Sequence, residues 1–153
     1  MGTAERKLAS IGLKVLAVSV GFIIVGYFGV YRERPVRNAH SDSINIEADL
    51  MAIAKEINKN LPAHINEGIV AESTMAGPGN SFMYVYTLTN VSSKDMNEEQ
   101  LKQEYSRDMT NWVCTNPQMA QFREDKTVLL YQYRGNDGKF IGQIRIQSAD
   151  CEQ

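Results

Sequence analysis

Apolar side chains recur at helical spacing in two long segments of the chain. Residues 46–61 carry isoleucine, leucine and alanine side chains on one face, and Pro62 ends this predicted helix. Asn97 and Gln100 have the spacing of a capping box, in which each side chain hydrogen-bonds to the backbone of the other residue. A second helix is therefore predicted over residues 97–113.

Shorter apolar runs bounded by turn residues predict four strands. Residues 68–75 and 82–89 flank a turn rich in glycine and proline, so they should form a hairpin. Residues 127–147 contain two more runs around a Gly-Asn-Asp-Gly turn, which predicts a second hairpin. Ahead of this hairpin, Asn116 and Pro117 predict the start of a short third helix.

This order of elements predicts an α+β domain. We expect a four-stranded antiparallel sheet with helices on one face, preceded by one N-terminal transmembrane helix. The strand at residues 82–89 raises a question about the second face of the sheet. Tyr84 and Tyr86 lie on one side of this strand and Met83 and Val85 on the other, so both sides are apolar. The pattern does not say what covers the second side.

Four tyrosines of the predicted hairpins are expected to form an aromatic cluster, namely Tyr84, Tyr86, Tyr131 and Tyr133. Two interpretations stay open. The side chains could lie at the edge of the core with their hydroxyl groups in water, as tyrosines commonly do. They could instead form an exposed patch that binds a partner, because tyrosine is enriched at protein interfaces.

The N-terminal part of the chain predicts a membrane anchor. Residues 15–31 contain no charge, and as a helix they would cover about 25 Å of the roughly 30 Å hydrocarbon core of a bilayer. We predict a cytoplasmic N-terminus at residues 1–10, a transmembrane helix at 11–31, a linker at 32–45 and a periplasmic domain at 46–153. A cleaved signal peptide is the alternative, but no small-x-small cleavage site follows the apolar run.

The predicted membrane helix also carries small residues on one side. Ala17 and Gly21 are four positions apart, a spacing that lets two membrane helices pack closely. Glycine is common in membrane helices in general, so this spacing permits a homo-oligomer without requiring one.

The distribution of charge narrows the choice of partners. Residues 1–37 hold six basic and two acidic residues, a net charge of +4, whereas the remainder holds ten basic and sixteen acidic residues, a net charge of −6. An acidic body does not suit a phosphate backbone, so nucleic acid is not an expected partner.

The two cysteines, Cys114 and Cys151, both lie in the acidic domain. Paired cysteines in a small domain outside the cytosol usually form a disulfide, and closing this loop would stabilise the fold by roughly 3–4 kcal/mol. Two separate buried thiols in a cytosolic domain are the alternative. The bridged interpretation places the domain in the periplasm of a bacterium, attached to the inner membrane by a single pass.

Residues that could carry chemistry are few. The chain has two histidines, His40 in the predicted linker and His64 in the loop after the first helix. No histidine and cysteine spacing resembles a zinc site, and the serines have no evident base partner. We therefore predict no metal, no cofactor and no enzymatic activity. An enzyme that uses His64 with nearby acids is a minor hypothesis.

Several short motifs between Asn58 and Cys151 resemble a pattern found in small bacterial envelope proteins with two cysteines and mostly no assigned activity. The motifs are Asn58-Lys59, Leu61-Pro62, Gly77-Pro78-Gly79, Tyr84-x-Tyr86-Thr87, Cys114 with Pro117, Tyr131-x-Tyr133 and Asp150-Cys151. The resemblance implies a periplasmic α+β domain and the cysteine bridge. It implies no reaction and no catalytic residue.

The predicted function is that of a non-enzymatic accessory module, anchored in the inner membrane, which binds another envelope protein. Secretion, efflux, respiratory or assembly complexes and phage exclusion are the candidate settings. The alternative is a periplasmic domain that binds a lipid or another small apolar ligand, with the tyrosine cluster as the wall of its pocket.

Overall fold

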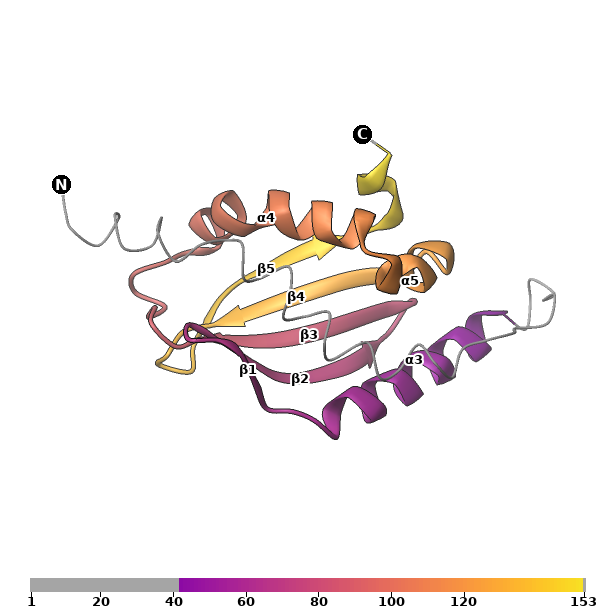
Figure 1. Ribbon diagram of the computed structural model, residues 1–153, viewed down its shortest axis with the longest axis horizontal. Coiled ribbons are helices and arrows are strands. Elements are labelled where there is room, and N and C mark those ends of the chain that lie inside the picture. The colour runs from indigo at the N-terminus through magenta and orange to yellow at the C-terminus, as the bar shows by residue number, and fades with distance from the viewer. Residues whose placement is uncertain (1–41, 153) are drawn as a thin grey trace.

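A computed structural model describes residues 42–152 of the protein, which fold around one five-stranded sheet (Figure 1). The helices are α3 (Asp42–Asn58), α4 (Glu98–Thr115) and α5 (Ala120–Glu124), with short 3-10 turns η2 (Pro117–Met119) and η3 (Ser148–Cys151). The strands are β1 (Ala63–Asn66), β2 (Ile69–Gly77), β3 (Ser81–Leu88), β4 (Val128–Arg134) and β5 (Phe140–Ile146).

The predicted four-stranded antiparallel sheet is wrong in two respects. The sheet has five strands in the order β1-β2-β3-β4-β5, and β3 pairs with β4 in parallel, so the sheet is mixed. The additional strand, β1, lies where a loop was expected and pairs antiparallel with β2. Both predicted hairpins, β2 with β3 and β4 with β5, are confirmed.

The parallel pair follows from the long connection between the two hairpins. After β3 the chain passes through α4, η2 and α5 before β4 begins, and Figure 1 shows these helices returning along the sheet. A parallel pair needs a crossover of this kind, usually a helix, because the chain must return to the same end of the sheet. The helical connection therefore lets β4 run in the same direction as β3.

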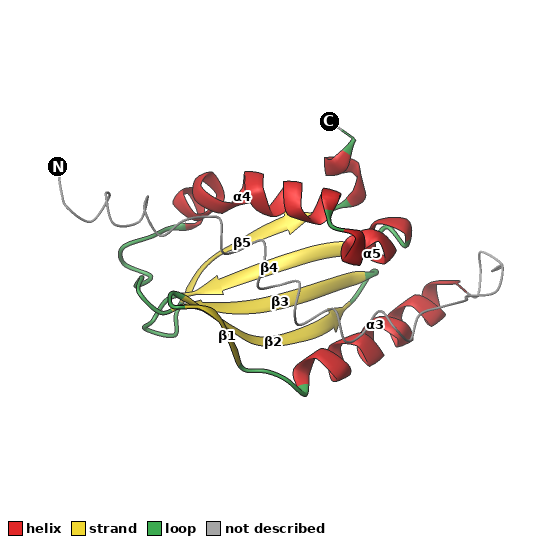
Figure 2. Cartoon of the chain, viewed as in Figure 1, coloured by secondary structure: helices red, strands yellow, loops and turns green. Residues whose placement is uncertain are grey.

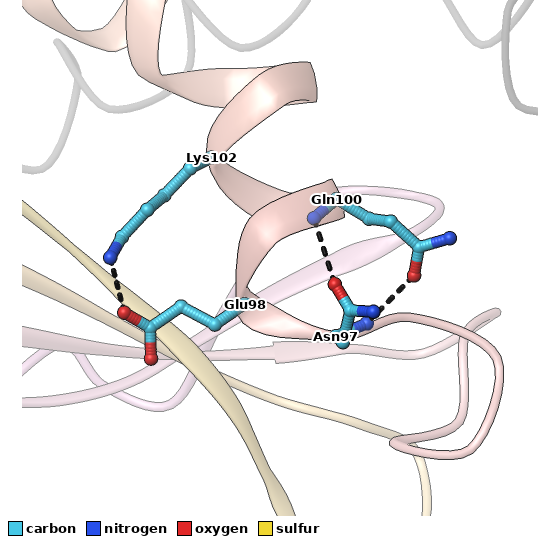
Figure 3. A network of polar contacts seen from close by, with 4 residues as sticks. All are labelled: Asn97, Glu98, Gln100 and Lys102. Carbon is cyan, nitrogen blue, oxygen red and sulfur yellow. Dashed lines mark hydrogen bonds and ion pairs between the residues drawn. The ribbon is translucent and has the colours of Figure 1, made fainter.

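Side chains cap both ends of α4. The predicted capping box is present: Gln100 N donates to Asn97 Oδ1 at 2.9 Å, and Asn97 N donates to Gln100 Oε1 at 3.0 Å (Figure 3). At the other end, Arg123 Nη1 donates to the carbonyl oxygens of Val113 at 2.5 Å and Asn116 at 3.0 Å. These contacts satisfy backbone groups that a helix leaves without partners at its ends.

Two close contacts hold α4 against β5 and against the turn η3 that follows it. Cys114 and Cys151 form the predicted disulfide, with their Cα atoms 5.3 Å apart, and so join the end of α4 to η3. Near the start of α4, a Cβ atom added at Gly142 would lie 2.8 Å from the Cα atom of Glu98. Only glycine allows the helix to approach the strand this closely.

The first described helix, α3, packs along β2. Its side chains Leu50, Ile53 and Ile57 are buried in the core. The helix ends at Asn58, before the predicted end at residue 61. Thr74 N donates to Asn58 Oδ1 at 2.7 Å, and Asn58 Nδ2 donates to the Thr74 carbonyl at 2.8 Å, so this side chain pairs with β2 as a neighbouring strand would.

The three helices within residues 42–152 contribute to one core on one face of the sheet, with α3 beside β2 and α4 beside β5 (Figure 2). None of the helices within residues 42–152 has both the length and the apolar content needed to cross a bilayer. The predicted cytoplasmic segment 1–10 and membrane helix 11–31 lie outside the described residues. Of the predicted linker, residues 42–45 belong to α3.

Candidate functional site

The four tyrosines form the predicted cluster, but in the core. Tyr84, Tyr86, Tyr131 and Tyr133 are each at most 5% exposed. Because β3 and β4 run parallel in register, Tyr84 lies beside Tyr131 and Tyr86 beside Tyr133. The rings stack, with centroids 5.3 Å apart in the first pair and 5.4 Å in the second. The cluster is therefore neither a half-exposed core edge nor an exposed patch, and its role in partner binding stays an untested prediction.

Burial sets the chemistry of this cluster. Desolvation raises the pKa of all four tyrosine hydroxyl groups above the ordinary value of 10.0, so they stay protonated at neutral pH. The hydroxyl oxygens of Tyr84 and Tyr131 are buried, and neither has a hydrogen-bond partner in the described structure. An unpartnered buried hydroxyl destabilises the fold, which makes these two groups exceptions that need an explanation.

The opposite face of the sheet carries no described helix, and we call it the open face. Met75 on β2 pairs in register with Met83 on β3, which in turn pairs with Leu130 on β4. None of the three belongs to the buried core cluster, and Met75 is 46% exposed. These side chains form an apolar row across three adjacent strands, which we call the methionine row.

Sequence reasoning found part of this surface. The apolar residues on both sides of β3 indicated a second apolar face, and Met83 belongs to it. Met75 was missed because the register between β2 and β3, which contains a bulge between Ala71 and Ser73, cannot be read from the sequence. The sequence also does not show which strands lie at the edges of the sheet, because it does not give the order of the strands.

The remaining predicted site residues stand apart from this surface or outside the described chain. His64 lies exposed on β1. Residues 42–152 contain no group of three or more histidine, cysteine, aspartate or glutamate side chains that could hold a metal ion. The small-residue pair Ala17 and Gly21 lies outside the described residues.

One exposed carboxylate organises the loops at one end of the sheet. Asp137, in the turn between β4 and β5, accepts hydrogen bonds from Ser93 Oγ at 2.7 Å and Ser92 Oγ at 3.3 Å. The bond from Ser93 is the main cause that lowers the pKa of Asp137 to about 2. The turn between β4 and β5 is therefore hydrogen-bonded to the loop that follows β3.

Comparison with known proteins identifies the family of the chain. Residues 45–141 match the family described as Domain of unknown function (DUF8479), and the chain belongs to this family. The sequence matches none of the curated proteins with which it was compared.

Solved structures share the fold at low sequence identity. A predicted secreted protein from Pseudomonas aeruginosa has 18% identity and a TM-score of 0.61, over 72% of this chain and 96% of that one. The pilotin EpsS of the Vibrio vulnificus type 2 secretion system has 12% identity and a TM-score of 0.60, over 74% and 98%. The type II secretion system pilotin AspS from Vibrio cholerae has 14% identity and a TM-score of 0.56, over 74% and 98%. At such identities the similarity establishes the fold alone.

Proposed function

We propose that the domain is a non-enzymatic accessory module that binds another envelope protein through its open face. The methionine row is the observation that carries this proposal. Methionine side chains are flexible and polarisable, and they recur on surfaces that adapt to a partner. An apolar row that crosses three strands, with Met75 46% exposed, is costly to leave in water and gains from being covered.

The setting that we propose is a bacterial secretion system, outside the cytoplasm. The Cys114–Cys151 disulfide supports this compartment, because such bonds persist in oxidising environments such as the periplasm. The shared fold with two pilotins of type II secretion systems supports the choice of a secretion system over the other envelope settings. Attachment to the inner membrane by residues 11–31 is a separate prediction that rests on the sequence alone.

Affinity purification of the full chain from its native host tests the proposal, with two exposed methionines as a matched pair. Met75 on the open face is 46% exposed, and Met51 on α3 is 55% exposed. We expect wild-type protein to retain a stoichiometric envelope protein, Met75→Lys to weaken the interaction by at least about tenfold, and Met51→Lys to leave it unchanged. Circular dichroism of each variant confirms that the fold is intact.

Two results would overturn the proposal. Wild-type protein that elutes as a lone chain under mild conditions has no such partner. A partner that Met75→Lys and Met51→Lys retain equally is bound elsewhere than the open face.

The unpartnered hydroxyl groups of Tyr84 and Tyr131 favour a second candidate, a domain that binds a small, mainly apolar ligand with a polar end. Because both hydroxyl oxygens are buried, the core would have to open for such a ligand to accept hydrogen bonds from them. Native mass spectrometry of the purified chain distinguishes the two candidates, because a bound ligand adds non-protein mass and a partner adds a polypeptide. The bare polypeptide mass argues against the ligand.

A further inference from the structure

The two edges of the sheet differ in how their backbone groups are satisfied. At one edge, β1 covers the first part of β2, and the Asn58 side chain pairs with Thr74 further along. At the other edge, β5 pairs with β4 on one side only. Within residues 42–152 no side chain or loop hydrogen-bonds to the outer side of β5. Such an edge presents a row of backbone groups that can pair with another chain.

A groove runs along this free edge, beneath the flank of α4. Its volume is about 550 Å³. It is lined by four residues of α4 spaced four positions apart and by four residues of β5: Glu98, Lys102, Ser106, Thr110, Phe140, Gln143, Ile144 and Arg145. The helix therefore contributes a single stripe of mainly polar side chains that follows the strand.

The groove lies beside the strand, in the plane of the sheet. Ile144 is buried in the core on the helix side, whereas Arg145 is paired with Leu130 and lies on the open face. A space that is lined by neighbouring residues from both faces of β5 has to lie at the outer edge of that strand. This is the position that a sixth strand would occupy.

The dimensions of the two walls agree. The stripe on α4 extends from Glu98 to Thr110, about 18 Å at the rise of an α-helix. The lining residues of β5 extend from Phe140 to Arg145, about 17 Å at the rise of a strand. A strand of roughly five or six residues would fill a groove of this length.

The charged side chains in the groove indicate what kind of peptide segment would bind there. The groove holds Lys102 and Arg145 against one carboxylate, Glu98, in a domain whose overall charge is strongly negative. Lys102 forms an ion pair with Glu98, and both residues line the groove (Figure 3 shows the pair). Arg145 is exposed, and no acidic side chain in the described part of the chain forms an ion pair with it. The positive surplus therefore lies on β5.

We infer that the groove between α4 and β5 binds an extended segment of a partner protein that carries acidic side chains, as a sixth strand of the sheet. Backbone hydrogen bonds to β5 would give affinity, and Arg145 and the α4 stripe would select the side chains. This inference rests on the proposed function, because it states the form in which part of the partner is recognised. It adds a second contact surface to the methionine row.

Fluorescence anisotropy with the full chain and labelled synthetic peptides tests this inference. The probes alternate valine with aspartate or valine with lysine, and the aspartate peptide is also made with N-methyl groups on every second amide, in each of the two possible phases. We expect the aspartate peptide to bind and the lysine peptide not to bind. Because a strand pairs through alternate amides, only one phase of N-methylation should abolish binding.

Substitutions inside and outside the groove test where the peptide binds. Arg145→Glu should weaken binding of the aspartate peptide by at least about tenfold, whereas Arg107→Glu, an exposed residue of α4 outside the groove, should leave it unchanged. Equal binding of both peptides, equal binding of both N-methylated forms, or no peptide binding would each overturn the inference. A dimer in light scattering that Arg145→Glu dissociates would do so as well, because the occupant would then be a second copy of the chain.

The failure of this inference can be told apart from the failure of the proposed function. A partner that co-purifies with Arg145→Glu but not with Met75→Lys leaves the open face as the binding surface and excludes the groove. A wild-type chain that retains no partner overturns the proposed function, whatever the peptides show.

Discussion

The buried tyrosine cluster predicts that the domain unfolds sharply at alkaline pH. Burial raises the hydroxyl pKa of Tyr84, Tyr86, Tyr131 and Tyr133 in the folded state, whereas in the unfolded chain each returns to the ordinary value of 10.0. The folded state therefore holds these protons more tightly. The stability that this provides is complete below pH 10 and is lost as the pH rises above it, because the unfolded chain ionises first.

The size of the loss follows from the number of buried groups. Well above pH 10, each tyrosine lowers the free energy of unfolding by about 1.4 kcal/mol per pH unit. Integrated to pH 11, the four groups together cost about 6 kcal/mol. A domain of this size has a free energy of unfolding of about 5–15 kcal/mol. We therefore expect unfolding to begin near pH 11, and to begin at a higher pH only if the free energy of unfolding lies at the upper end of this range.

The double variant Tyr84→Phe with Tyr131→Phe is the informative perturbation. It removes two of the four ionisable groups, so the loss at pH 11 should fall to about 3 kcal/mol. It also removes two buried hydroxyl groups that have no hydrogen-bond partner, and each removal should stabilise the domain at neutral pH by about 1–3 kcal/mol. Tyr105→Phe is the control, because Tyr105 is only partly buried and should change the alkaline transition less.

Two signals recorded during one pH titration decide the outcome. Tyrosinate absorbance reports ionisation, and far-ultraviolet circular dichroism reports the fold. We expect the cluster to ionise in the same cooperative step in which the circular dichroism signal is lost. Ionisation of all tyrosines near pH 10 with the fold retained would refute the burial of the cluster. A double variant that is less stable at neutral pH would show that the two hydroxyl groups have hydrogen-bond partners in solution, such as the bound ligand of the second candidate function.

Three further predictions test contacts elsewhere in the domain. Reduction of the Cys114–Cys151 disulfide should lower the free energy of unfolding by roughly 3–4 kcal/mol, measured by urea denaturation with and without reductant; an unchanged midpoint would show that the bond is absent in solution. Gly142→Ala should destabilise the domain by about 1–3 kcal/mol, because its Cβ atom would lie 2.8 Å from Glu98 Cα, and an unchanged melting temperature would contradict this close approach. Asp137→Asn should flatten the acid limb of the stability curve between about pH 4 and pH 2, because the lowered pKa of Asp137 stabilises the fold above this window and is lost within it; identical curves would show that its serine contacts are not formed.

Local features of the sequence predicted most of the elements correctly. The capping box of Asn97 and Gln100 specifies a helix start through two hydrogen bonds within four residues, so no tertiary information is needed to recognise it. The hairpins could be predicted in the same way, because turn residues and flanking apolar runs are adjacent in the chain. The disulfide was predicted because two cysteines in a small domain outside the cytosol usually pair, and the bridged interpretation in turn indicated the periplasm.

The order and direction of the strands in the sheet could not be predicted from such local features. A hairpin pattern fixes the pairing within each hairpin and not the direction in which one hairpin meets the other. The helical connection between β3 and β4 permits a parallel pair, and the prediction of an entirely antiparallel sheet ignored it. The strand β1 has only four residues, Ala63–Asn66, with polar side chains among them, and it exists because β2 offers a partner.

The face on which the tyrosines lie depends on the positions of the helices. The helix α3 packs beside β2 and α4 beside β5, so the central strands β3 and β4 lie between the two helices (Figure 1). Large side chains are needed to fill the core over these strands, and stacked tyrosine rings supply that bulk. The smaller and more flexible methionine and leucine side chains then lie on the open face. A slip of β3 by one residue would exchange the two sets and leave the core underfilled, so packing on the helix side determines that the methionine row faces outward.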